Sequence, residues 1–140
     1  MRPFAIALVG LVLGQPGNVL NGNWTATFQG TTYVRLAFAE GATVPQGTMS
    51  IAQSIHADDE GNVDSVIVGS FRPTRMLDLR WNDGVLSFGV KDGPDVDRFE
   101  FRPIDADHAE LAMIFSEEER RQAAAEHLPV PKPFRLTKTP

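Results

Sequence analysis

The chain has 140 residues, 42% of them hydrophobic, a length that accommodates one domain with one sizeable core. Its formal net charge of −5, from 13 Lys and Arg against 18 Asp and Glu, argues against a nucleic-acid partner, because binding phosphates requires clustered basic residues. The sequence contains no Cys, so the fold relies on its core rather than on disulfides.

The N-terminus carries one basic residue, Arg2, followed by an uncharged apolar run that ends at Gly14. This run is shorter than the roughly 20 residues that cross a bilayer, so no integral membrane span is expected. It is typical of a secretory signal peptide over residues 1–14, cleaved near Gln15. The alternative is a buried first strand or helix.

The domain organisation follows from this interpretation. Residues 15–20 form a Gly-, Pro- and Asn-rich spacer, and residues 21–140 form a single domain. A signal peptide indicates an exported protein, and a chain without Cys suits a bacterial periplasm or exterior.

Alternation of apolar with polar side chains predicts half-buried β-strands along most of the chain. The expected strands in the first half of the chain cover residues 22–28, 33–38, 48–55 and the short apolar run 66–68. In the second of these, Val34 faces the core, whereas Tyr33 takes the opposite face. The third is expected to be continuous, with Gln53 as the one polar residue on its core face.

Residues 75–90 predict a β-hairpin. Asp83-Gly84 suits a type I′ turn, because both central residues need positive φ. This turn pairs Leu77 with Val90, Leu79 with Phe88 and Trp81 with Leu86, and it places all six side chains on one face.

Two further strands are expected at residues 98–102 and 109–115, after which the β pattern ends. Ser116 and Glu119 form a capping box, so a helix starts there, and prolines from Pro129 onward stop it. A last strand covers Phe134–Lys138. The fold class is therefore all-β, an antiparallel up-and-down meander of about eight strands closed into a barrel, with one short helix before the last strand. A two-sheet sandwich is the alternative.

The segment Gly22-Asn23-Trp24 matches the G-x-W of the first strand of lipocalins and related calycin barrels, which the chain resembles. Together with Leu36-Ala37-Phe38, Val85–Phe88 and Pro133–Lys138, it also resembles small all-β modules of bacterial exported proteins that often precede secreted α/β-hydrolase domains. The resemblance implies a lipocalin-like barrel over residues 21–138.

The resemblance further implies how the barrel closes. In calycin barrels the indole of the G-x-W strand packs against a basic side chain of the last strand. Arg135 and Lys138 are the candidates for stacking on Trp24. Lys138 shares a face with Leu136, which is expected to point inward, whereas Arg135 takes the opposite face, so Lys138 is expected over Trp24.

Residues with the potential for chemistry are scattered. The histidines His56, His108 and His127 lack metal-ligand spacing, and the acidic turn after His56 does not fit a calcium loop, so no metal or cofactor is expected. There is no nucleophile motif, and Asp95, Asp97 and Glu100 read as a charged turn that leads into a strand rather than as catalytic carboxylates.

The sequence thus predicts an exported, non-enzymatic β-barrel that binds a small hydrophobic ligand in its interior. Ten candidate residues line that interior: Trp24, Phe28, Leu36, Phe38, Met49, Leu79, Phe88, Phe99, Phe101 and Met113. These side chains also suffice to fill a small barrel. In that case the alternative is a protein-interaction or accessory domain for an envelope or secreted enzyme, and an enzyme with a novel site in the barrel mouth is a third hypothesis.

Overall fold

A computed structural model describes residues 22–39 and 46–139. The predicted signal peptide and spacer lie outside these residues. The strands are β1 (Gly22–Phe28), β2 (Thr31–Phe38), β3 (Gly47–Ile51), β4 (Ser54–Ala57), β5 (Val63–Ile67), β6 (Thr74–Asn82), β7 (Val85–Asp92), β8 (Asp95–Pro103), β9 (His108–Ile114) and β10 (Phe134–Thr139). The helix α3 covers Glu117–Ala125 and precedes β10.

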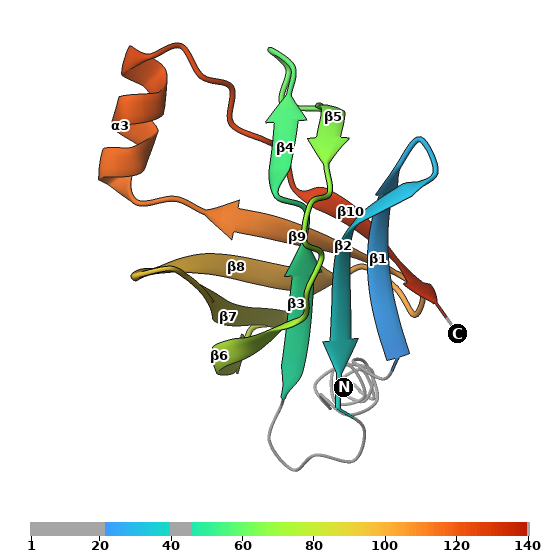
Figure 1. Cartoon of the computed structure of the whole chain (residues 1–140). Helices are drawn as coiled ribbons and strands as arrows, with labels where there is room; N and C mark the ends of the chain where they lie inside the picture. The colour runs from blue at the N-terminus through green and yellow to red at the C-terminus, as the bar shows by residue number, and fades with distance from the viewer. Residues whose placement is uncertain (1–21, 40–45, 140) are drawn as a thin grey trace, which may run out of the picture.

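Eight strands close into an antiparallel barrel in the order β1-β10-β9-β8-β7-β6-β3-β2 (Figure 1). Every neighbour is the next barrel strand along the chain, and β10 returns to β1, so the topology is an up-and-down meander. The predicted barrel is confirmed and the sandwich is excluded. Closure removes the exposed sheet edges that an open meander of this size would present.

The closing pair sets Trp24 directly opposite Lys138. The Lys138 Nζ lies 5.6 Å from the centroid of the Trp24 ring, in the range of a cation–π contact. Arg135 is exposed on the other face of β10. Lys138 therefore lies on the inward face of the last strand and stacks on Trp24, as predicted.

Buried aromatic side chains fill the interior of the barrel around Trp24. The Trp24 ring meets Phe101 edge to face at 5.2 Å between centroids, and Phe38 lies 5.5 Å from Phe101 on another side. Phe88 stacks on Phe99 at 5.6 Å. These contacts bury the largest apolar surfaces of the chain, which is the main source of its stability.

The β6–β7 hairpin agrees with the predicted register near its turn and departs from it beyond. Asp83 and Gly84 both have positive φ, and Trp81 pairs with Leu86 as expected. The register shifts between Leu77 and Arg80, where Asp78 adopts a φ of 49° and adds one residue to β6. Such a bulge reverses the parity of the residues before it.

The predicted pairing of Leu77 with Val90 is therefore wrong, and the predicted pairing of Leu79 with Phe88 falls within the bulge. Met76 lies opposite Val90 and is buried, whereas Leu77 lies opposite Gly89 and is 36% exposed. Asp78 and Leu79 together oppose the single residue Phe88. An Asp tolerates the left-handed conformation that this arrangement requires.

Two further sequence expectations are corrected. The predicted continuous strand 48–55 is broken: the N–H of Ala52 donates to Tyr33 at 2.9 Å, and the next N–H, of Gln53, donates to Val68 at 3.0 Å. The chain leaves the barrel there and forms a separate two-stranded sheet, β4-β5. Tyr33, expected on the outer face, is buried at a register shift between β1 and β2 and packs edge to face on Phe134.

The seam between β3 and β6 is short. Only Thr48 with Arg75 and Met49 with Thr74 define its register among the described residues. The neighbouring β7–β8 pair, in contrast, is continuous from Leu86 with Phe101 to Asp92 with Asp95. The barrel wall is thus unevenly bonded around its circumference.

The helix α3 stands away from the barrel (Figure 1). Its predicted capping box is present: the N–H of Glu119 donates to Ser116 Oγ at 3.1 Å, and the N–H of Ser116 donates to Glu119 Oε1 at 2.8 Å. None of its residues is buried. In the described part of the chain, no helix is long and apolar enough to cross a membrane.

Candidate ligand pocket at the barrel mouth

One end of the barrel opens into a pocket of about 520 Å³, which we call the mouth pocket. The strands β3, β6, β7, β8, β9 and β10 all contribute residues to it at this end, and the segment that joins β5 to β6 crosses its rim. The volume falls in the range of pockets that hold small organic ligands. The mouth pocket is therefore the candidate functional site.

The floor of the mouth pocket is apolar. Met49, Phe99 and Phe134 line it, and each is 2% exposed. Alternate residues of a strand point to the same face, and these three side chains point into the barrel. Met113 and Ile51 extend the apolar lining toward the rim.

The ten predicted interior residues divide into three groups. Met49, Phe99 and Met113 line the mouth pocket, and Phe38 and Leu79 line a second pocket on β2, β3 and β6. Trp24, Leu36, Phe88 and Phe101 are fully buried in the core, and Phe28 packs against it. Half of the predicted lining is thus packed core, and the other half lines two separate pockets.

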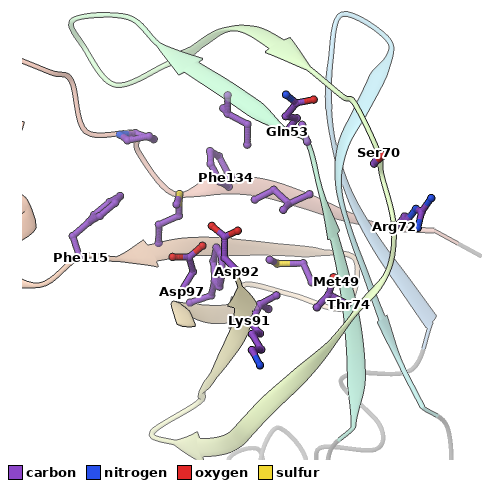
Figure 2. Close-up of a pocket in the computed structure, with 17 residues that line it drawn as sticks. Met49, Gln53, Ser70, Arg72, Thr74, Lys91, Asp92, Asp97, Phe115 and Phe134 are labelled. Carbon is purple, nitrogen blue, oxygen red and sulfur yellow. The ribbon is translucent and has the colours of Figure 1, made fainter. Parts of the chain in front are cut away.

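The rim of the mouth pocket is polar and carries two carboxyl groups. Asp92 ends β7 and Asp97 lies on β8, and Figure 2 shows their side chains next to each other within the pocket. Burial, then the charge of Asp92 and a hydrogen bond with it, raises the pKa of Asp97 above its ordinary value. Glu119 and Asp95 act in the same direction.

Sequence reasoning weighed Asp95, Asp97 and Glu100 as a carboxylate group, and the structure gives a different pairing. Glu100 points to the outer face of β8, opposite Ser87, and Asp95 does not line the mouth pocket. Asp92 was missed. The signal for it is the two-residue turn Gly93-Pro94, which fixes Asp92 opposite Asp95 and hence on the inward face.

The pKa shift of Asp97 gives a testable dependence of stability on pH. Because its folded-state pKa is raised above 3.8, the stability associated with its protonation is present below that value and is lost as the pH rises through the folded pKa. Asp97→Asn should therefore stabilise the protein at neutral pH, by less than about 1 kcal/mol because the site is open to solvent. The gain should vanish in acid.

Urea denaturation across this pH range measures the effect. Glu100→Gln, which removes a carboxylate from the outer face of the same strand, is the matched control and should show no such gain. A loss of stability in Asp97→Asn at neutral pH would contradict the assignment.

The histidines lie outside the mouth pocket. The His56 ring bonds to Asp64 across the β4–β5 hairpin, and the His108 ring lies 2.9 Å from Asp105 Oδ1. Hydrogen bonds from the Asp107 backbone and from His108 lower the pKa of Asp105. No cluster of three or more His, Asp or Glu side chains suited to a metal ion occurs within residues 22–39 and 46–139.

A groove of about 550 Å³ separates α3 from β4. Apolar side chains in it include Phe115, Leu128 and Val130, of which the last two are 56% and 49% exposed. The N–H of Lys132 donates to Gly61 at 2.9 Å and joins the segment after α3 to the β4–β5 turn. We call this third concave surface the helix groove.

No family model, curated protein or solved structure matches this chain. The class of the protein is therefore given by its fold, a closed eight-stranded antiparallel β-barrel with a pocket at one end.

Proposed function

We propose that this protein is a non-enzymatic binding protein that takes a small ligand with an apolar body into the mouth pocket. The observation that carries the proposal is the combination of an apolar floor, built by Met49, Phe99 and Phe134, with a polar rim in one cavity of about 520 Å³. Small-molecule sites in proteins share this composition, and the mouths of β-barrels are one of their preferred places.

We further propose that the barrel is lipocalin-like and that the protein is exported. Support for the first comes from Gly22-Asn23-Trp24 on β1, from the stacking of Lys138 on Trp24 and from the helix before the last strand. Support for the second comes from the sequence of residues 1–14.

A neutral aromatic probe tests the binding proposal. Naphthylmethanol, which has intrinsic fluorescence and a volume well below that of the mouth pocket, should bind to the wild-type protein and compete with any native ligand. Met113→Trp places a larger ring in the half-buried lining and should weaken binding by about tenfold or more, which corresponds to the loss of roughly 1.4 kcal/mol. Fluorescence titration measures both affinities.

Leu128→Trp is the matched control. It introduces the same ring into the helix groove, and Leu128 does not line the mouth pocket. Probe binding should be unchanged in this variant. Absence of binding to the wild type, or equal binding to Met113→Trp, would contradict the proposal.

The second candidate function is that of an accessory domain that docks on an envelope or secreted enzyme. The helix groove favours it, because α3 buries no residue against the barrel and Leu128 and Val130 remain exposed. Weakened probe binding in Leu128→Trp together with normal binding in Met113→Trp would move the site from the barrel mouth to this groove.

A further inference from the structure

On the inward face of the β7–β8 hairpin, apolar side chains are replaced by carboxyl groups at the barrel mouth. Phe88 opposite Phe99 belongs to the packed core, and the next inward position on β8 is Asp97, opposite Val90. Asp92 lies one further step outward on β7. The two carboxyl groups therefore occupy the face that the strands otherwise devote to the core, at the level where the mouth pocket begins.

The two basic side chains that line the mouth pocket form no salt bridge with these carboxyl groups. Lys91 and Arg72 also line the mouth pocket, but Figure 2 shows that their side chains extend away from Asp92 and Asp97. In the part of the chain that the structure describes, neither carboxylate has a Lys or Arg nitrogen within the 4.0 Å of a salt bridge.

The other charged groups that act on Asp97 are also acidic. Asp92 and Asp95 lie on either side of the β7–β8 turn, and Glu119 lies on α3. Like charges at short range are unfavourable unless a proton or a cation lies between them. The local field beside Asp92 and Asp97 therefore favours a positive group.

We infer that the mouth pocket binds an amphipathic amine, with its ammonium group between Asp92 and Asp97 and its apolar body against Met49, Phe99 and Phe134. This inference rests on the proposed function and adds the charge class of the ligand. The apolar floor and the acidic rim belong to a single cavity, so one molecule with a cationic head and an apolar body satisfies both. Charge-assisted hydrogen bonds to carboxylates are stronger than neutral ones. The ammonium group therefore distinguishes an amine from a neutral ligand of the same shape.

Three probes that share one ring test the inference. Naphthylmethylamine is cationic at neutral pH, naphthylmethanol is neutral and naphthoate is anionic. We expect the amine to bind at least about tenfold more tightly than the alcohol, because a hydrogen bond to a charged group contributes about that much, and naphthoate to bind most weakly. Acidification that protonates Asp97 should weaken the amine and leave the alcohol unchanged.

Substitution of the two carboxylates locates the preference. Asp92→Asn with Asp97→Asn should reduce the ratio of amine to alcohol affinity to about one while alcohol binding persists, and each single variant should reduce it in part. Alcohol binding in these variants also reports that they are folded. Glu100→Gln, on the outer face of β8, should keep the wild-type ratio.

The outcomes separate the two proposals. If the alcohol binds at a Met113-sensitive site and the amine binds no more tightly, or if the preference survives in the double variant, the amine inference is overturned and the binding function stands. If no probe binds, or if Met113→Trp has no effect on any probe, the proposed function fails and the inference fails with it.

Discussion

Trp24→Ala should destabilise the protein by about 3–5 kcal/mol, the range for loss of a large aromatic side chain from a core. The Trp24 side chain is fully buried, meets Phe101 edge to face at 5.2 Å and carries Lys138 over its ring. The substitution thus removes core volume and the side-chain contact across the β1–β10 closure at once. Urea unfolding measures the change in the free energy of unfolding.

Trp24→Phe is the control for the polar part of the indole. The Nε1 atom of Trp24 is buried without a hydrogen-bond partner among the described residues. Leaving a buried donor unsatisfied is unfavourable, so replacing the indole with a phenyl ring removes that penalty together with some packing. Trp24→Phe should cost clearly less than Trp24→Ala. Equal losses for the two variants would show that ring packing is not what Trp24 contributes.

Phe88→Ala should also cost about 3–5 kcal/mol, because Phe88 is fully buried and stacks on Phe99. Its neighbour Ser87 points to the outer face, where its hydroxyl contacts Arg80 at 3.5 Å, the outer limit of a hydrogen bond. Ser87→Ala should therefore change stability by less than about 0.5 kcal/mol. Thermal and urea unfolding of both variants give the ranking.

The comparison of these two neighbours tests the phase of β7. Because successive residues of a strand point to opposite faces, a shift of one position exchanges their roles. A larger loss in Ser87→Ala than in Phe88→Ala would place β7 one residue out of register with β8.

The sequence predicts the parts of this fold that depend on local chemistry. Asp83-Gly84 fixes a turn because few residues accept positive φ, and Ser116 with Glu119 fixes the start of α3. Alternation places Lys138 on the inward face of β10. Each of these features requires only residues that are close in the chain or a parity that continues without interruption.

The features that sequence reasoning missed are places where the alternation of inward and outward side chains is interrupted. At the β6 bulge, Met76 and Leu77 are both apolar, so the sequence offers no contrast that shows which of them faces the core. At Ala52 the backbone hydrogen bonding changes partner from β2 to the segment after β5. This change depends on residues that are distant in the sequence. An extra residue or a change of partner leaves no local signature.

The candidate site was only partly predictable for a related reason. Its apolar floor came from strand alternation, as Met49 and Phe99 illustrate. Its acidic rim was read as a solvated turn, because charged residues near a Gly-Pro pair usually are. Only the pairing of Val90 with Asp97 shows that the carboxylate lies on the inward side.

Because the seam between β3 and β6 is short, we expect the free energy of local opening to differ around the barrel. Regions with few ladder hydrogen bonds open at lower free energy than continuous ones, so backbone amides at the β3–β6 seam should exchange with solvent before those between β7 and β8. Met49 and Thr74, which define the seam, both line the mouth pocket. Local opening there would widen the pocket on one side while the β7–β8 wall keeps Asp97 in position, and it would give a bulkier ligand a route inward without unfolding of the barrel.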